Sequence, residues 1–480
     1  MIKRFLFALS LFALSPIASA QDEEAESLAG TWAGEIKYGG MEFPVVFELK
    51  DAPGGLYTGQ VRFPTEGDKG IPISAITVDG RKVTFVIKVA DATYEGRLSS
   101  ANRIRGEWKA KDGEADLDLK REEGGFAYKR PQNPREPFPY EVQEVEISNN
   151  LLGANHKLAG SLSKPERPVR AVPAVILISD AGPHDRDGAV ASHRPFAVLS
   201  DFLTRQGIAV LRLDDRGTGK STGYFESAST TDFTTDVLVA LDFLREQKDV
   251  DPSKIGLIGH GEGAIVASLV AAQRDDVSFI VMLAGHGLQG DRTLLARSEA
   301  LGTAAGLPAD FIQTSQRISL EMFKVLKEGN VDLEKLAKLG QAFEQRMKTL
   351  NKNNVRDQGG AGDFVEVLGA QFNNLESIWL RAFVQLDPAD SLKSVTCQVL
   401  ALNGDRDLEV VADLHLAAIE SALKAGGNER VVTRKLTGLN HLFQTADRGF
   451  PNKYSTIEET MSPVVLKGVS QWIGGVVVGN

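Results

Sequence analysis

The chain has 480 residues, of which 42% are hydrophobic and 25% are charged, and its formal net charge is −10. This composition excludes a disordered or fibrous chain, and the length allows two or more domains with cores of their own. The acidic balance argues against a nucleic-acid partner, and we expect none.

The first twenty residues predict an export signal. Two basic residues precede an apolar stretch over residues 5–14, and Ala18-Ser19-Ala20 supplies small residues before an acidic segment. The apolar stretch is too short to span a bilayer, and no cysteine near the cleavage site offers a lipid attachment point. We therefore expect residues 1–20 to be removed and a soluble protein without a membrane span to be exported, to the periplasm or the extracellular space. Its net charge would then be about −12.

Residues 28–122 predict a small all-β domain. Short alternating segments rich in β-branched and aromatic residues recur between turn residues, which is typical of a small barrel or sandwich. These segments cover residues 31–37, 44–50, 57–63, 71–78 and 82–88. Gly30-Thr-Trp32 recurs as Gly106-Glu-Trp108, but a single pair is no repeat, and two tryptophans in one core are the simpler interpretation. The region contains no histidine, and we find no catalytic grouping in it.

Four prolines within residues 123–140 predict an extended, semi-rigid connector, and a second domain is expected over residues 141–480. There, apolar strands alternate with helical patterns. The strands are expected at 141–148, 157–163, 172–179, 207–213, 254–259, 279–283, 399–402 and 430–436. Continuous apolar runs such as residues 174–178 are typical of parallel strands covered on both faces. The pattern predicts an α/β fold with a doubly wound, mostly parallel sheet.

Residues 307–383 interrupt this alternation. Helical patterns at 311–328 and 333–350 are followed by a polar run and by the loop Gly359-Gly-Ala-Gly. Because the insertion stands between two core strands, we expect a helical cap over the carboxyl edge of the sheet, where it would shape a substrate pocket. An inert insertion is the alternative.

Residues 254–266 predict a strand, a glycine-bounded turn and a helix, with the turn reading Gly259-His-Gly-Glu-Gly263. In the G-x-S-x-G nucleophile elbow, the outer glycines permit a sharp turn that lifts a central hydroxyl above the sheet. Gly261 stands at that central position. The sequence therefore predicts the turn without its nucleophile.

Two later positions give this turn a chemical context. Asp407 follows the strand at 399–402, and His441 follows the last strand, which is the order of nucleophile, acid and histidine in α/β-hydrolases. A lone histidine in a loop is usually a surface residue, but the strand context and the paired acid favour a triad position for His441. Asp405 is the alternative acid. The backbone N–H groups of Ala181 and Glu262 are predicted to form the oxyanion hole.

One segment imitates other catalytic motifs. Gly219-Lys-Ser-Thr-Gly223 matches G-x-S-x-G and resembles the end of a phosphate-binding P-loop. However, Asp214 stands where a P-loop needs glycine, and the next helical pattern begins only near Asp232. We therefore interpret residues 215–219 as a tight structural loop.

Neither a metal nor another cofactor is expected. A site built from His260, His286, His441 and Asp407 is conceivable, because all four could lie at the carboxyl edge of the sheet. No metal-binding spacing supports it, and a histidine inside an elbow usually packs beneath the turn. The single cysteine, Cys397, lies in an apolar run and is interpreted as a buried strand thiol.

Taken together, these motifs resemble exported α/β-hydrolase family proteins in which a small β domain precedes a serine-hydrolase domain. This group is related to prolyl oligopeptidase and serine aminopeptidase-like hydrolases, and its members are usually described as esterases. The matching segments are Gly182-Pro-His-Asp-Arg-Asp187, His193-Arg-Pro-Phe196, Asp215-Arg-Gly-Thr-Gly219, Gly259-His-Gly-Glu-Gly263, Leu402-Asn-Gly-Asp-Arg-Asp-Leu408 and Leu439-Asn-His-Leu-Phe-Gln444.

The elbow of this family reads Gly-His-Ser-Glu-Gly. The resemblance therefore implies His441 as the base, Asp407 as the acid and Gly261 in the place of the serine. The chain also departs from the family at Val411, Gln398 and His286, where prolines are common.

Three hypotheses for function follow. In the first, which we favour, the protein is a pseudo-hydrolase that binds a small ester or acyl ligand or a protein partner. In the second, a water in the space left by the missing side chain is activated by the His441 and Asp407 pair, giving a weak hydrolase. Such a site typically retains only ~10³–10⁴-fold acceleration over water. In the third, a neighbouring hydroxyl such as that of Ser179 substitutes.

Overall fold

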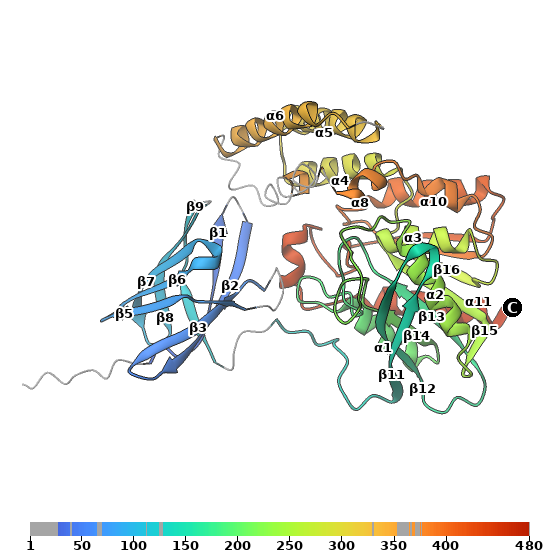
Figure 1. The fold of residues 1–480 in the computed structure, drawn as a ribbon, viewed down its shortest axis with the longest axis horizontal. Coiled ribbons are helices and arrows are strands. Elements are labelled where there is room, and N and C mark those ends of the chain that lie inside the picture. Colours follow the sequence, from blue (N-terminus) through green and yellow to red (C-terminus); the bar gives the residue numbers. More distant parts are fainter. Residues whose placement is uncertain are drawn as a thin grey trace, which may run out of the picture.

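The computed structural model describes residues 27–38, 41–64, 70–111, 113–123, 128–328, 331–352, 364, 367–369, 375 and 377–479. The predicted signal and the Gly359-Gly-Ala-Gly loop lie outside these residues. Two β-rich units lie side by side, with a layer of helices above them (Figure 1). No helix in the described part of the chain is long and apolar enough to cross a membrane.

The first unit is one curled antiparallel sheet. Its strands are β1 (Gly30–Tyr38), β2 (Met41–Ala52), β3 (Leu56–Arg62), β4 (Ile71–Pro72), β5 (Ala75–Asp79), β6 (Lys82–Ile87), β7 (Ala92–Ser100), β8 (Arg103–Ala110), β9 (Gly113–Asp116) and β10 (Leu119–Glu122). They run in the order β4-β3-β2-β1-β10-β8-β7-β6-β5, with β9 paired to β8. The single strand expected at 71–78 is divided into β4 and β5, which pair with opposite ends of the sheet.

Only Ile73 and Ser74 separate these two edge strands, so the sheet closes on itself as a small barrel. Ile73 donates its N–H to Gly59 on one side, and Ser74 donates to Val86 on the other. Inside the barrel, Trp32 and Trp108 share one hydrophobic core, as the sequence suggested.

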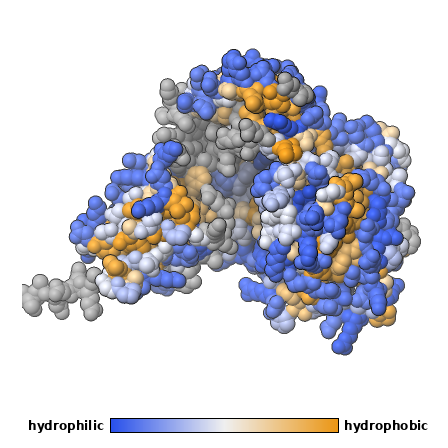
Figure 2. Space-filling view, in the orientation of Figure 1, coloured by the Kyte–Doolittle hydropathy of each residue, from blue (hydrophilic) through white to orange (hydrophobic). Residues whose placement is uncertain are grey.

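The proline-rich connector is bound to the second unit at two residues. Arg130 donates hydrogen bonds to backbone carbonyls of Ser192 and Ser455, and Gln132 donates to the carbonyl of Met461. A direct contact also joins the units, because Ser192 Oγ donates to the carbonyl of Pro64 over 2.8 Å. Figure 2 shows mainly hydrophilic residues on both units, with smaller hydrophobic patches among them.

The second unit contains an eight-stranded sheet in the order β11-β12-β14-β13-β15-β16-β17-β18. The strands are β11 (Tyr140–Asn149), β12 (His156–Pro165), β13 (Val172–Ile178), β14 (Ala209–Leu213), β15 (Val250–His260), β16 (Phe279–Leu283), β17 (Gln398–Gly404) and β18 (Val431–Leu436). The first two are antiparallel to their neighbours, and the strands from β14 to β18 pair in parallel. The predicted mostly parallel α/β sheet is confirmed.

Helices cover both faces of this sheet, as its apolar strands require. On one face, α1 (Pro195–Arg205) and α11 (Pro463–Gly479) pack in a core with Val175 and Leu177 of β13. On the other face, α2 (Phe233–Arg245), α3 (Glu262–Ala271) and α10 (Ala412–Ala425) pack against Ala174 and Ile176 of the same strand. Alternate residues of one strand therefore enter two separate cores.

An insertion between β16 and β17 forms the upper layer in Figure 1. It contains α4 (Gly290–Ala304), α5 (Ala309–Lys327), α6 (Leu333–Lys352), α8 (Ile378–Phe383) and α9 (Pro388–Leu392). The helices α5 and α6 correspond to the two helical patterns in the sequence. The helical region begins at Gly290, earlier than the expected start at residue 307. The sequence did not predict α4 because its buried side includes Asp291, Thr293 and Ser298 and lacks an apolar stripe.

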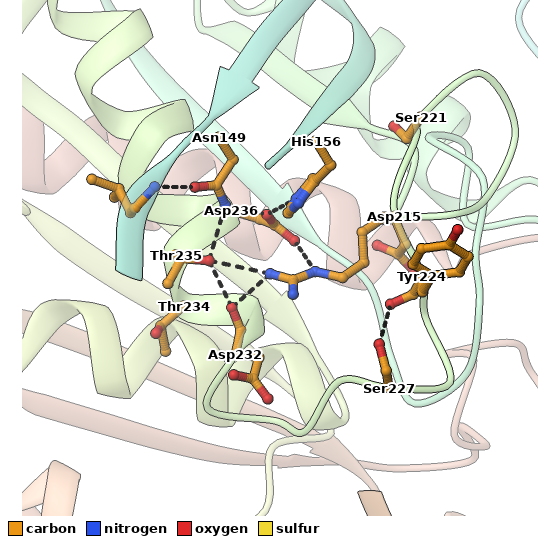
Figure 3. A network of polar contacts seen from close by, with 12 residues as sticks. Asn149, His156, Asp215, Ser221, Tyr224, Ser227, Asp232, Thr234, Thr235 and Asp236 are labelled. Atoms are coloured by element: carbon orange, nitrogen blue, oxygen red, sulfur yellow. Dashed lines mark hydrogen bonds and ion pairs between the residues drawn. The ribbon is translucent and has the colours of Figure 1, made fainter. Parts of the chain in front are cut away.

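A buried polar network ties the antiparallel edge of the sheet to α2 (Figure 3). Asp236 of α2 accepts hydrogen bonds from Asn149, over 2.6 Å, and from Arg216, over 2.8 Å, and its carboxylate lies 2.7 Å from His156 Nε2. Arg216 also donates to Thr235. Because these residues come from β11, β12, the loop after β14 and α2, the network fixes the loop that follows β14.

Candidate active site

Gly261 forms a sharp turn between β15 and α3, at the carboxyl end of the strand. Its backbone has φ 51° and ψ −115°, a conformation that is strained for any residue with a side chain. A Cβ on Gly259 would lie 2.2 Å from the carbonyl oxygen of Gly263, and a Cβ on Gly263 would lie 2.3 Å from that of Ile178. The outer glycines are therefore required by close packing, as the predicted elbow demands.

His441 and Asp407 lie together beside this turn. His441 Nδ1 donates to Asp407 Oδ2 over 2.9 Å, and Asp407 Oδ1 accepts two backbone N–H groups of its own loop, each over 2.8 Å. Both residues are buried. Asp405, the alternative acid, accepts the backbone N–H of Gly438 instead. The structure thus places Asp407, and not Asp405, against the histidine.

The carboxylate of Asp180 fills the space beside Gly261. A Cβ built on Gly261 would lie 1.8 Å from Asp180 Oδ1. That oxygen accepts the N–H of Glu262 over 2.8 Å and the N–H of Ala181 over 2.7 Å. The other oxygen, Oδ2, lies 2.9 Å from His441 Nε2. One carboxylate therefore takes both predicted oxyanion donors and the nitrogen that would face a nucleophile. The space in which the second sequence-based hypothesis placed a water borders directly on this carboxylate.

Two flanking carboxylates set the protonation of His441. Burial acts to lower the pKa of His441, but the charges of Asp407 and Glu409 and the hydrogen bond to Asp180 hold it well above its usual value of 6.5. Burial acts to raise the pKa of Asp180, but the hydrogen bond and charge of His441 hold it well below 3.8. Both directions favour the charged forms of the pair, an imidazolium at His441 and a carboxylate at Asp180.

His260 packs directly against His441. Its Nε2 donates to the carbonyl oxygen of His441 over 2.9 Å, and the two ring centroids are 4.7 Å apart. Burial lowers the pKa of His260, so its imidazole is neutral. This is the packing role that the sequence suggested for a histidine in the elbow.

A metal ion fits this cluster poorly. Within the described residues, Asp180, His260 and His441 offer ligand atoms that lie within 4.8 Å of one another. A zinc ligand must present a free lone pair to the ion. Nε2 of His441 lies 2.9 Å from Asp180 Oδ2, so an ion would have to displace the proton that these two atoms share. We therefore derive no step through a metal.

A cavity of about 160 Å³ opens beside Asp180 and His441, beneath the inserted helices. Its other lining residues are Ala181, His286, Thr293, Leu294, Arg297, Trp379, Phe383, Glu409 and Val410. Five of these nine come from α4 and α8. The insertion therefore contributes directly to the walls of the candidate site.

Two polar atoms in the cavity wall are left without a partner. His286 Nδ1 and Arg297 Nε are buried and form no hydrogen bond within the described part of the chain. Burial lowers the pKa of His286 to about 4, so its ring is neutral at pH 7. The guanidinium of Arg297 pairs through Nη2 with Glu409. Unsatisfied buried polar atoms are rare in native proteins, so these two make the wall of the cavity unusually polar.

The side chain of Glu262 is a second buried carboxylate next to the site. Thr230 Oγ1 and Trp379 Nε1 both donate to its Oε1. Burial raises the pKa of Glu262 to about 7 from its ordinary value of 4.5, although these two hydrogen bonds act to lower it. Between pH 4.5 and about pH 7, the folded protein therefore keeps a proton on Glu262 that the unfolded chain has already lost.

This shift predicts a pH-dependent effect of Glu262→Gln. The wild-type protein should lose stability as the pH rises from about 4.5 to about 7, because ionising the buried carboxyl is costly. Glutamine keeps the acceptor oxygen and has no charge to lose. Above pH 7, the variant should be more stable by about 3–4 kcal/mol, at roughly 1.4 kcal/mol per pKa unit. Urea unfolding at pH 5 and pH 8 measures the difference, and an equal effect at both values would contradict it.

The remaining candidates from the sequence have structural roles. Ser179 Oγ donates to both oxygens of Asp215, over 2.7 and 2.9 Å, so it is engaged away from His441. Ser221 Oγ donates to the carbonyl of Asp214, as expected for a tight structural loop. Cys397 is half-buried, and burial raises the pKa of its thiol to about 12, which makes it unreactive.

The residue that sequence reasoning missed is Asp180. The sequence pattern assigned a role only to the backbone N–H of the next residue, Ala181. A signal was present, because an acidic residue beside an N–H group expected to bind an oxyanion is an unusual choice. That signal has meaning only together with Gly261, 81 positions later in the chain.

Parts of the chain are similar to known hydrolases. A family profile described as serine aminopeptidase, S33, matches residues 187–335. Esterase EstD of Thermotoga maritima is 26% identical over 212 residues, covering 43% of this chain and 48% of that protein. The putative hydrolase YtaP of Bacillus subtilis is 29% identical over 185 residues, covering 35% of this chain and 61% of that protein. The chain thus spans about half to three fifths of the length of these curated relatives.

Solved structures that the chain resembles include two esterases. Est1E of Butyrivibrio proteoclasticus, with bound ferulic acid, is 18% identical with a TM-score of 0.40, covering 70% of this chain and 99% of that one. The Pyrococcus furiosus esterase Pf2001 is 17% identical with a TM-score of 0.42, covering 74% and 98%.

The eight-stranded sheet, the elbow and the order of acid and histidine define an α/β-hydrolase. Within that class, parts of the chain are similar to the serine aminopeptidase, S33, profile and to a curated esterase.

Proposed function

We propose that this protein is an α/β-hydrolase without the serine-esterase reaction, and that its covered cavity binds a small ligand. The observation that carries the proposal is the position of Asp180. Its carboxylate lies where the side chain of a nucleophile would begin, 1.8 Å from a Cβ on Gly261, and it occupies both oxyanion donors. An ester carbonyl would find neither a hydroxyl nor a free N–H pair at this point.

The ligand proposed from the sequence was a small ester or acyl compound, with a protein partner as an open possibility. The cavity favours a small molecule with a polar group, because Trp379 and Phe383 supply apolar rings while His286 and Arg297 offer unpartnered polar atoms. Export to the periplasm or the extracellular space remains a prediction from the first twenty residues.

Four proteins test the loss of the esterase reaction: the wild type, Gly261→Ser, Asp180→Ala and the double variant. Hydrolysis of 4-nitrophenyl butyrate and labelling by a fluorophosphonate, read by mass spectrometry, are measured for each. We expect no labelling of the first three, because in Gly261→Ser the carboxylate of Asp180 still competes for the same space. The double variant should be labelled, and its hydrolysis should exceed that of Gly261→Ser by about 10²-fold, the usual effect of oxyanion stabilisation.

The matched control is His441→Ala in the double variant, which should abolish the gained activity. Thermal unfolding of every variant shows that each is folded. Ester turnover by the wild-type protein at ordinary enzyme rates, about 1–10³ s⁻¹ and lost in His441→Ala, would overturn the proposal.

A further inference from the structure

The arrangement around Asp180 is more specific than a blocked site. One oxygen is held by two backbone N–H groups, and the other faces a histidine that is itself oriented by an acid. Simple obstruction would not need both oxygens to be placed in this way. A carboxylate is also a recognised nucleophile in enzymes.

We propose that Asp180 is a catalytic nucleophile that displaces an anionic leaving group from a saturated carbon of a small alkyl substrate. This inference goes beyond the proposed function. It rests on the proposed function in one respect, which is that Asp180 and not a serine holds the nucleophile position. The geometry selects saturated carbon over an acyl carbon. Attack on an ester carbonyl needs a free oxyanion hole in the first step, and here Oδ1 fills that hole.

In the first step, Asp180 Oδ2 forms a bond to the saturated carbon while the bond from that carbon to the leaving group breaks. The leaving group departs as an anion with the bonding electron pair. The carboxylate becomes a neutral ester, so His441 loses one of the two carboxylates that flank it. Its proton then leaves with the anion, and the imidazole becomes a base.

In the second step, a water attacks Cγ of Asp180 and gives one proton to His441 Nε2. Negative charge develops on Oδ1, which the N–H groups of Glu262 and Ala181 already bind at 2.8 and 2.7 Å. Collapse breaks the bond between Cγ and Oδ2 and releases the alcohol, which takes the proton from His441. The new carboxyl group returns its own proton to His441 and restores the ion pair. The sum is alkyl halide and water giving alcohol, proton and halide.

The cavity supplies what a departing anion requires. Asp180 and His441 line it together with His286 and Arg297, whose unpartnered Nδ1 and Nε are buried in its wall. The guanidinium of Arg297 adds positive charge, although its pairing with Glu409 offsets part of this. The rings of Trp379 and Phe383, stacked with centroids 4.9 Å apart, form an apolar wall for a short alkyl chain.

The first test uses 1-bromobutane with the full chain and its His441→Gln and Asp180→Asn variants. In His441→Gln the alkylated enzyme should accumulate, because no base activates the water. Mass spectrometry should find one added butyl group on the peptide containing Asp180. Asp180→Asn should gain no butyl group and release no bromide. Asp405→Asn is the matched control in the neighbouring loop and should match the wild type, because asparagine keeps the acceptor for Gly438.

The second test is a single turnover of the wild-type protein in water enriched in oxygen-18. The label should appear in the Asp180 carboxylate, while the first butanol formed carries the original Oδ2. Label in the butanol alone, or bromide release by Asp180→Asn, would overturn the inference, as would the absence of any butyl adduct in His441→Gln. Bromide release that is abolished by a chelator and restored by zinc would overturn it too, and would assign Asp180, His260 and His441 to a metal. The esterase gain of the Asp180→Ala, Gly261→Ser double variant is independent of all these results, so the two proposals fail separately.

Discussion

Gly261→Ala is expected to lower the free energy of unfolding by about 3–5 kcal/mol, from backbone strain and the loss of buried hydrogen bonds. Its Cβ would lie 1.8 Å from Asp180 Oδ1, and its backbone has a φ of 51°. The carboxylate must therefore leave the N–H groups of Ala181 and Glu262 and the ring of His441. Each of these donors would then lose its acceptor, and two of them belong to the buried residues Glu262 and His441, whereas Ala181 is exposed.

A double-mutant cycle separates the clash from the strain. In an Asp180→Ala background the carboxylate is already gone, so Gly261→Ala should cost only the strain of its backbone, about 1–3 kcal/mol. Urea unfolding of the four proteins gives the coupling between the two positions, which we expect to reach at least ~1.5 kcal/mol. Additive effects would mean that the carboxylate does not hold this position in solution.

Gly261 and Asp180 also show how much of the site the sequence could predict. Asp407 and His441 could be found because each follows a strand in a chain order that α/β-hydrolases share. Gly261 could be found because its turn has a fixed spacing of glycines. The role of Asp180 depends on a contact across the sheet, between the loops that follow β13 and β15, and no periodicity along the chain records such a contact.

The fold was also predictable in part. Apolar runs gave the parallel strands, because both faces of each strand are buried and the pattern is strong. The division of residues 71–78 into β4 and β5 was not visible, since a continuous β-type pattern does not show that its two halves pair with different neighbours. The helix α4 was missed because polar residues lie on its buried side. It is also the helix that brings Thr293, Leu294 and Arg297 to the cavity.

The second large effect is expected at Asp236 of α2. Asp236→Ala should destabilise the protein by about 3–5 kcal/mol, because it leaves a buried cation without its partner. The side chains of Arg216 and Asp236 are only 10% and 12% exposed, and His156 and Asn149 would also lose an acceptor (Figure 3). Asp236→Asn keeps the shape and one acceptor oxygen, so its cost should be intermediate.

Asp242 provides a control on the same helix. Its carboxylate pairs with Arg274 over 2.9 Å, but its side chain is 57% exposed, and such surface pairs contribute about 0–1 kcal/mol. Asp242→Ala should therefore leave the urea midpoint almost unchanged, while Asp236→Ala shifts it strongly. If both variants shifted the urea midpoint equally, the loss of any acidic residue from α2 would explain the destabilisation, and the buried network would not. This network fixes the loop that carries Asp215. Asp215 accepts a hydrogen bond from the hydroxyl of Ser179, the residue before Asp180. Loss of the network should therefore also disturb the position of Asp180, the candidate nucleophile.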